Sequence, residues 1–279
     1  MAKKGRRKTK KNRGCTFVLF FCLILILILG GVGFKYRHQI AYYYSIYFQP
    51  FRQLKLSNSA FETYRMNKII DKHSDKVFGI DISHYQKRRQ FKWDSLQIKQ
   101  QEVPIHFVLM RATMGNSSKD GNFKYFWKKT KKNNYIRGAY HYYRPDEDPK
   151  RQANNFLKTI RLQKGDLRPV LDIEKLPHLE DESELIKNLK IWLNLVEKKY
   201  GVKPIIYTYY HFYKDYLQHD IKGYPIWMAN YNDVPQPIPD NQWDFWQFSE
   251  KGIIKGINTK VDLNVFNGNL KDLEKFRLK

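Results

Sequence analysis

The chain has 279 residues, 42% of them hydrophobic and 16% aromatic, which is enough for one large core with or without an appendage. This composition excludes an intrinsically disordered chain. The 51 lysines and arginines outnumber the 27 acids and give a formal charge of +24, which favours an anionic partner such as nucleic acid, anionic lipid or a carboxylate-bearing wall polymer. A basic composition without any functional meaning gives the same excess.

The N-terminus predicts a membrane anchor. Residues 1–14 form a basic tail without acids, and the uncharged run at 15–33 is rich in Leu and Ile. Because a helix rises 1.5 Å per residue, about 20 residues span a hydrocarbon core of roughly 30 Å. We therefore expect a single transmembrane helix with its N-terminus in the cytoplasm and the rest of the chain on the periplasmic or cell-wall side. The span explains the basic tail better than nucleic-acid binding does, so no nucleic-acid partner is predicted.

Two other interpretations of this region are weaker. A cleaved signal peptide is the main alternative, but the apolar core is longer than usual and no A-x-A-like site lies near Gly30–Lys35. The two cysteines are Cys15 and Cys22, so the rest of the chain is free of disulfide and thiol chemistry. Cys22 follows Phe20 and Phe21 instead of small residues, which argues against lipidation.

Residues 34–76 mix aromatic residues with scattered charges and contain few turn signals. We interpret them as a partly helical stalk or linker whose first aromatics suit the membrane interface. No chemistry is assigned to this segment.

Residues 77–279 alternate short apolar runs with amphipathic segments, which predicts an α/β fold. Strands are expected at 77–82, 105–111, 136–143, 169–173, 204–208, 225–229, 243–248 and 260–265. Helices are expected near 93–101, 121–133, 149–161, 183–199 and 210–218. The clearest helix is 183–199, with Asp181 and Glu184 as a capping box and Gly201 as its stop. Five β-α units followed by three bare strands predict an irregular, TIM-like (β/α)5β3 barrel.

Acidic residues stand at the positions where such a barrel carries its reacting groups, in or at the ends of strands. They are Asp81, Asp172, Glu174 and Asp262. Strand alternation puts Asp172 and Glu174 on one face and Ile173 on the other. A single D-x-E motif usually has only a structural role, with its acids paired to helix caps or to basic residues. Four acids in apolar strand contexts favour a functional cluster instead. A close carboxyl pair, one protonated and one ionised, is what glycoside hydrolysis requires.

A hard-cation site built from the same acids is the rival chemistry, but no H-E-x-x-H or EF-hand spacing occurs, and we predict no metal. His84, His141 and His211 are expected near the strand ends as hydrogen-bonding or core residues. Aromatic residues in or just after the strands could stack on sugars, although alternation must turn some of them away from the cleft. They are Tyr140, Tyr142, Tyr207, Trp227, Tyr231 and Trp246.

Taken together, these residues resemble the lysozymes of glycoside hydrolase family 25 over roughly residues 77–270. The resemblance rests on the ordered motifs FGIDISHYQ (78–86), RGAYHYYRP (137–145), PVLDIE (169–174), PIIYT (204–208), YPIWMANY (224–231), WxFWQF (243–248) and VDLNxF (261–266). It departs from the family at none of the acid positions.

The resemblance implies a muramidase that cleaves the β-1,4 bond between N-acetylmuramic acid and N-acetylglucosamine in peptidoglycan, without a cofactor. Glu174 then resembles the general acid/base, and Asp172 the partner that stabilises the cation or orients the acetamido group. Asp81 and Asp262 would position the substrate and tune that pair. Substrate-binding residues expected on this basis are Tyr140, Tyr142, Tyr207, Trp227, Asn230 and Gln247. The alternatives are a catalytically inactive glycan-binding module that anchors wall to membrane, and a glycosidase acting on another acetamido-sugar polymer.

Overall fold

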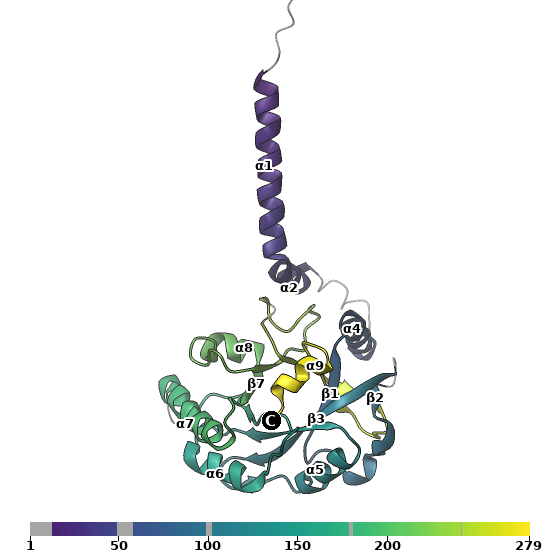
Figure 1. Cartoon of the computed structure of the whole chain (residues 1–279), viewed down its shortest axis with the longest axis vertical. Coiled ribbons are helices and arrows are strands. Elements are labelled where there is room, and N and C mark those ends of the chain that lie inside the picture. The colour runs from purple at the N-terminus through teal and green to yellow at the C-terminus, as the bar shows by residue number, and fades with distance from the viewer. Residues whose placement is uncertain (1–12, 49–57, 99–101, 179–180, 241) are drawn as a thin grey trace, which may run out of the picture.

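The computed structural model of the chain describes residues 13–48, 58–98, 102–178, 181–240 and 242–279, with side chains from Phe20 onwards (Figure 1). Nearly all of the basic tail at 1–14, and residues 49–57 of the expected stalk, lie outside this part of the chain.

An eight-stranded barrel forms the body of the protein, as expected from the sequence. Its strands, in spatial order, are β1 (Val77–Ile82), β3 (Val103–Met114), β5 (Ile136–Tyr142), β6 (Val170–Asp172), β7 (Ile205–Tyr209), β8 (Ile226–Ala229), β9 (Phe245–Gly252) and β11 (Val261–Phe266). Neighbours from β1 to β9 run parallel. Because β11 is antiparallel to both β9 and β1, it closes the ring. The carboxyl ends of the parallel strands therefore meet at one end of the barrel.

Helices cover the barrel where the sequence predicts them, with one exception. They are α5 (Phe123–Lys132), α6 (Pro149–Thr159), α7 (Glu182–Tyr200) and α8 (Tyr210–Phe212), which continues as a π-helical turn at Tyr213–Leu217. Asp181 caps α7 through the backbone N–H of Glu184 at 3.0 Å, and Gly201 ends it with φ 69° in the left-handed region that favours glycine.

The prediction of a helix near residues 93–101 is wrong. The described residues there form a 3-10 turn at Trp93–Ser95 and the short strand β2 (Gln97–Ile98). β2 pairs with the start of β3 and with β10 (Ile254–Lys255), so inter-strand hydrogen bonds take the backbone groups that a helix would have used. β4 (Ser118–Lys119) adds a second short pairing at the other end of β3.

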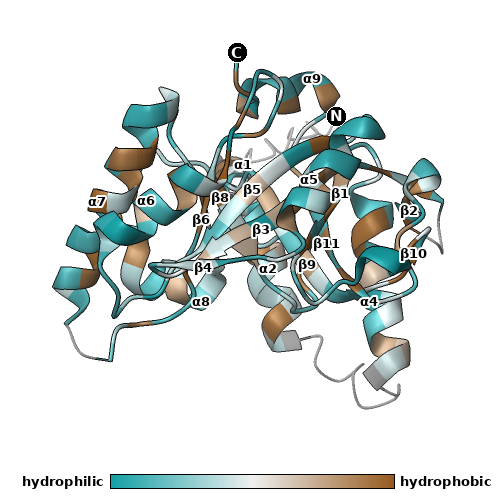
Figure 2. Ribbon diagram, turned by 90° about the horizontal axis from the view of Figure 1, so that it is seen from below, coloured by the Kyte–Doolittle hydropathy of each residue, from teal (hydrophilic) through white to brown (hydrophobic). Residues whose placement is uncertain are grey.

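The core has two layers. Between the sheet and the helices, the apolar face of α7 buries Leu185, Leu189, Trp192, Leu193 and Val196. Figure 2 shows hydrophobic and hydrophilic residues alternating along α6 and α7, as in helices with one buried stripe. Inside the barrel a second cluster includes Phe107, Tyr207, Trp227 and Phe245. The interior is thus a packed core and not a channel.

Part of the expected stalk belongs to the globular body. α4 (Asn58–Lys72) buries Met66, Ile69 and Ile70, and its Arg65 is fully enclosed and donates from Nη1 to the carbonyl oxygen of Phe248 at 2.7 Å. The sequence did not predict this contact because the helix is polar on average. Its apolar residues nevertheless recur at helical spacing and form one buried face.

The N-terminal helices are α1 (Arg13–Lys35) and α2 (Arg37–Phe48). Within the described residues, no single helix meets the length and hydropathy expected of a membrane span. The segments Phe20–Lys35 and Arg37–Tyr47 meet it only as a pair, and they are bent by 73° relative to each other.

Candidate active site

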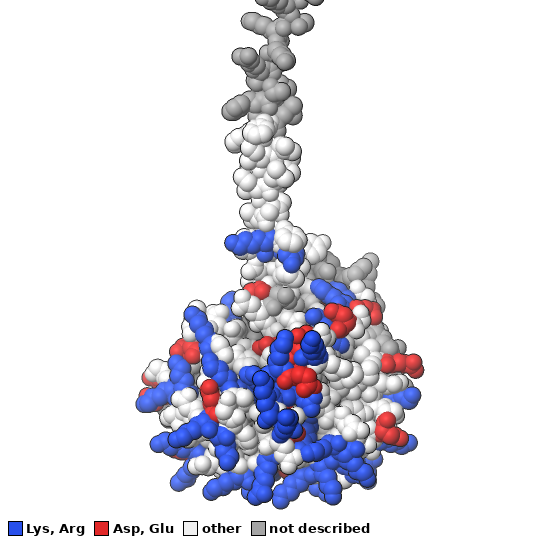
Figure 3. Space-filling model, in the orientation of Figure 1, with Lys and Arg blue, Asp and Glu red and all other residues white. Residues whose placement is uncertain are grey.

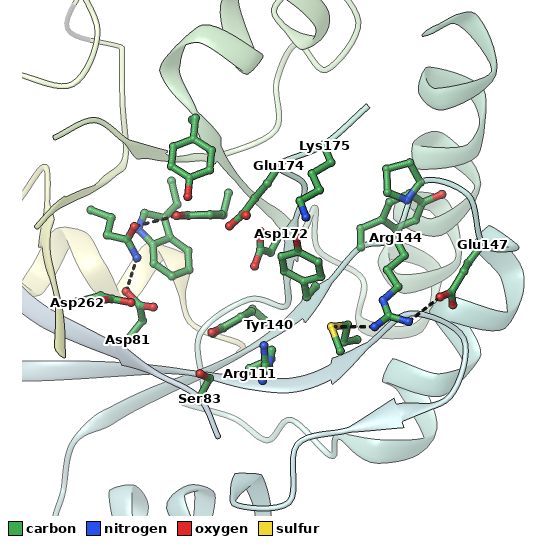
Figure 4. Close-up of a pocket in the computed structure, with 18 of the residues that line it drawn as sticks. Asp81, Ser83, Arg111, Tyr140, Arg144, Glu147, Asp172, Glu174, Lys175 and Asp262 are labelled. Atoms are coloured by element: carbon green, nitrogen blue, oxygen red, sulfur yellow. Dashed lines mark hydrogen bonds and ion pairs between the residues drawn. The ribbon is translucent and has the colours of Figure 1, made fainter. Parts of the chain in front are cut away.

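A cleft of about 580 Å³ opens at the carboxyl ends of the barrel strands (Figure 4). All four acids singled out in the sequence line it, so strands far apart in the chain bring them together. Of the residues expected to bind substrate, the cleft is lined by Tyr140, Tyr142, Tyr207, Trp227 and Gln247.

Asp172 and Glu174 form the first carboxyl pair. Asp172 is the last residue of β6 and Glu174 lies two residues beyond it, while Ile173 between them is fully buried in the outer core, on the opposite side. Figure 4 shows both acid side chains directed into the cleft, and the two carboxyl groups are hydrogen-bonded to each other. Burial and the neighbouring charge of Glu174 raise the pKa of Asp172 well above its usual range, and burial raises the pKa of Glu174. The pair therefore retains a proton at pH values where isolated carboxyl groups have lost theirs.

Asp81 and Asp262 form the second pair. They are direct cross-strand partners in the antiparallel pairing of β1 with β11, and their carboxyl groups are hydrogen-bonded. Burial, followed by the charge of Asp81, raises the pKa of Asp262 to about 9, and burial raises the pKa of Asp81 to about 6. At neutral pH Asp262 is thus protonated and donates to Asp81, which is largely ionised.

Two amide side chains fix the position of Asp81. Its Oδ2 accepts hydrogen bonds from Nε2 of Gln247 and Nδ2 of Asn264, both at 2.7 Å. Gln247 in turn accepts from the hydroxyl of Tyr207 at 2.8 Å, and Asn264 accepts from the indole nitrogen of Trp227 at 2.7 Å. Each amide therefore links an aromatic wall of the cleft to the same carboxylate. Because all these groups are buried and paired, the network holds one geometry.

The aromatic residues divide between wall and contact surface. Tyr140, Tyr207 and Trp227 expose only 8%, 5% and 2% of their surface, and the Tyr207 and Trp227 rings pack edge-to-face with centroids 4.5 Å apart. Tyr142 is half-buried at the rim, where it remains accessible to a sugar ring. Most of the predicted aromatics therefore shape the cleft, and few are free to stack on a substrate.

Asn230 and Trp246 lie outside the cleft, contrary to the sequence-based expectation. Nδ2 of Asn230 donates to the carbonyl oxygen of Pro237 at 2.8 Å, and its backbone carbonyl accepts from the Trp246 indole at 2.8 Å. These bonds hold the loop after β8 against the barrel. Side chains alternate across a strand, and the sequence motif did not show which face each residue takes.

The three histidines singled out in the sequence do not line the cleft. His141 is fully buried on the outer face of β5, where it bonds Oγ1 of Thr113 at 2.7 Å and Oε1 of Gln152 at 3.1 Å. His84 is exposed and contacts Arg111, and His211 is exposed on α8.

Cationic residues of the cleft were missed by the sequence reasoning. They are Arg111, Arg144 and Lys175. Arg111 points into the cleft and is held from behind by Asp120, with Nε to Oδ2 at 3.4 Å, while Arg144 pairs with Glu147 at 2.9 Å. Their sequence signal is position alone, since Lys175 directly follows Glu174 and Arg144 follows β5. Among the described residues, no group of His, Cys, Asp and Glu is arranged to hold a metal ion.

Known proteins are similar to this chain in both sequence and architecture. The sequence profile described as Glycosyl hydrolases family 25 matches residues 80–257. The uncharacterized protein YegX of Escherichia coli K12 is 38% identical over 204 residues, covering 72% of this chain and 73% of that protein. The autolytic lysozyme of Clostridium acetobutylicum is 30% identical over 189 residues, covering 68% of this chain and 55% of the relative.

Solved structures of the same family are also similar to this chain. A family 25 glycosyl hydrolase from Bacillus anthracis superimposes with a TM-score of 0.65 at 27% identity, over 73% of this chain and 94% of that one. A bacterial lysozyme from Streptomyces coelicolor gives 0.64 at 26% identity, over 72% and 97%. The chain therefore belongs to glycosyl hydrolase family 25, and it is a glycoside hydrolase.

Proposed function

We propose that the protein is a membrane-anchored muramidase that hydrolyses the β-1,4 bond between N-acetylmuramic acid and N-acetylglucosamine in peptidoglycan. The observation that carries this proposal is the hydrogen-bonded Asp172/Glu174 pair, which retains a proton in an open, sugar-sized cleft. Names of relatives such as autolytic lysozyme support the choice of substrate.

In the proposed reaction Glu174 protonates the leaving glycosidic oxygen and later takes a proton from the attacking water. Once the pair's proton has been transferred, both carboxylates are ionised and can stabilise the positive charge that develops on the sugar. Apart from the Glu174 carboxyl group, the buried Oδ1 of Asp172 has no hydrogen-bond partner within the described part of the chain. This acceptor suits an N–H group of the substrate, which supports a role for Asp172 in orienting the acetamido group.

Asp81 and Asp262 support the reacting pair from the other side of the cleft. Because Asp262 holds a proton, the second pair carries about one negative charge instead of two. That single charge, placed on Asp81 by Gln247 and Asn264, favours an oxocarbenium-like sugar without forcing another proton onto Glu174.

The proposed location is the cytoplasmic membrane, with the N-terminus in the cytoplasm and the barrel on the periplasmic or cell-wall side. Exposed apolar side chains along α1 support this, among them Phe21 at 64% and Leu27 at 66% exposure. Figure 3 shows the described part of α1 as a column with charged side chains only at its base, projecting from a barrel whose visible face carries many Lys and Arg. Such a column would be costly to expose to water and is stable in lipid.

Analysis of the reducing ends released from purified peptidoglycan tests the activity. New muramic acid ends are expected. New glucosamine ends would indicate a different bond specificity. Cleavage of chitin-like polymers instead would indicate that the substrate is another acetamido-sugar polymer, and the absence of new ends would indicate a glycan-binding module.

A second experiment tests the topology. Protease added to intact spheroplasts should degrade the barrel, and full protection would contradict the proposed orientation.

A further inference from the structure

The short helix α2 is docked on the barrel. It leaves α1 at a bend of 73°, and its Tyr42 is only 1% exposed. The Tyr42 hydroxyl accepts a hydrogen bond from Nδ2 of Asn230 at 3.3 Å, and its ring packs edge-to-face on Tyr210 with centroids 5.5 Å apart. Ser45, one turn along, is also buried. The segment after α1 is therefore seated on the barrel and does not act as a free linker.

The opposite face of α2 is apolar and exposed. At 100° per residue, the residues at spacings of three, four and seven share one side of a helix, and that side lies opposite Tyr42 and Ser45. It carries Ile40, Tyr43, Tyr44 and Tyr47, which are 56%, 44%, 56% and 67% exposed. From residue 39 to residue 48 the sequence has no Lys, Arg, Asp or Glu. A helix with one face on a protein and the other in water normally carries charged or polar residues on its outer face.

We propose that this outer face lies in the headgroup region of the bilayer, so that α2 holds the barrel directly against the membrane surface. The inference rests on the proposed membrane anchor and goes beyond it. The bilayer is the fitting occupant because the face continues directly from α1, which enters the membrane in the proposed topology. Tyrosines are favoured at that depth, where the ring contacts lipid and the hydroxyl meets water. Lys35 and Arg37 at the bend can extend their charged ends to the lipid phosphates.

The barrel contributes to the same surface. A groove of about 520 Å³ beside α2 is lined by Tyr36 at the bend, by Tyr43 of α2, and by Tyr210, Tyr213 and Lys214 from the segment after β7. The groove is aromatic and nearly neutral, since Asp240 balances Lys214. Such a lining suits the interfacial zone of a bilayer better than it suits bulk water.

The seating fixes the direction in which the cleft opens. In Figure 1 α1 runs upward from the barrel, α2 lies between them, and the barrel end that carries α9 and the C-terminus faces the viewer. Figure 2 shows the C-terminus at one end of the barrel and β4, beside the carboxyl end of β3, at the other. The cleft therefore opens in a direction roughly perpendicular to α1, which in the proposed topology is parallel to the membrane surface. A glycan strand lying parallel to the bilayer and close to it is the substrate that can enter.

Nitroxide labels on the full chain in lipid nanodiscs test this seating. Single cysteines would be introduced by Ile40→Cys and Tyr47→Cys in a background with Cys15→Ser and Cys22→Ser, and depth would be measured from collision with oxygen and with a water-soluble nickel complex. Leu27→Cys on α1 serves as the lipid reference and Lys128→Cys on α5, on the far side of the barrel, as the aqueous reference. Digestion of soluble glycan fragments would check that each labelled protein is folded.

We expect the labels at positions 40 and 47 to show strongly reduced nickel collision relative to position 128, at a depth shallower than position 27. If position 27 lies in lipid while 40 and 47 match 128, the anchor stands and the seating is overturned. If position 27 is also aqueous, the anchor itself fails and the seating fails with it.

Discussion

The two ends of the barrel are built on the same strands and differ in what they bury. At the carboxyl ends, four acids are enclosed with a few polar partners, and burial raises the pKa of each. At the opposite end, Phe245 packs against Phe107, Phe266 and Phe276 with ring centroids 5.7, 5.0 and 5.5 Å apart. Buried carboxyl groups oppose folding while buried rings favour it. The closed end therefore offsets the cost of the acid-lined end, which is itself unfavourable for stability.

The largest expected effect is on catalysis. Glu174→Gln keeps the shape of the side chain and removes its titrating proton, so activity on peptidoglycan should fall by about 10²–10⁴-fold. Folding and glycan binding should persist, as checked by thermal unfolding and by a pull-down on insoluble peptidoglycan. Glu184→Gln, an exposed acid on α7, is the matched control and should retain full activity. Unchanged activity in Glu174→Gln would refute its assignment.

The closed end should behave in the opposite way. Phe245→Ala removes a fully buried ring, and we expect it to lower the free energy of unfolding by about 3–5 kcal/mol. The activity of the molecules that remain folded should be close to that of the wild type. Denaturant titration measures the loss, and Leu270→Ala, at a side chain that is 47% exposed at the same end, should cost less than about 0.5 kcal/mol. An equal loss in both variants would contradict the contrast between a packed end and a reactive end.

The stability contributed by Asp262 should depend on pH. Its folded pKa of about 9 lies above the unfolded value of about 3.9, so the stability that this group contributes is complete below pH 4 and is lost as the pH rises towards 9. Asp262→Asn removes that loss, and the variant should gain on the order of 1–3 kcal/mol relative to wild type between pH 4.5 and pH 8.5.

Thermal unfolding at the two pH values measures this gain. Asp220→Asn, at a surface acid paired with Lys190, should show no such trend. A difference between Asp262→Asn and wild type that stays the same at both pH values would show that Asp262 titrates normally.

The smallest effect is expected just outside the cleft. Asp181→Ala removes the N-cap of α7 and should cost about 1 kcal/mol with no change in activity per folded molecule. Asp181→Ser keeps a capping oxygen and should recover most of the stability. A loss of activity in Asp181→Ala would extend the catalytic end beyond the cleft described above.

The sequence by itself determined the order of the barrel strands, the bounds of α5, α6 and α7 to within two residues, and the position of the acids at strand ends. These features are local, because periodicity, capping residues and strand ends are written in neighbouring residues. The Asp172/Glu174 pair was predictable for the same reason, since a spacing of two places both side chains on one face of an extended chain.

Only the tertiary structure decided what depends on contacts between distant residues. Asp81 meets Asp262 because β11 closes the ring antiparallel to β1, and no local pattern encodes that register. β2 replaced an expected helix because β3 and β10 supply its hydrogen bonds, and Asn230 faces Pro237 instead of the cleft. α4 and α2 joined the body because the barrel offers them apolar surface. Local sequence set the type of most elements, while pairing between distant strands decided β2, and packing between elements sets where each side chain points.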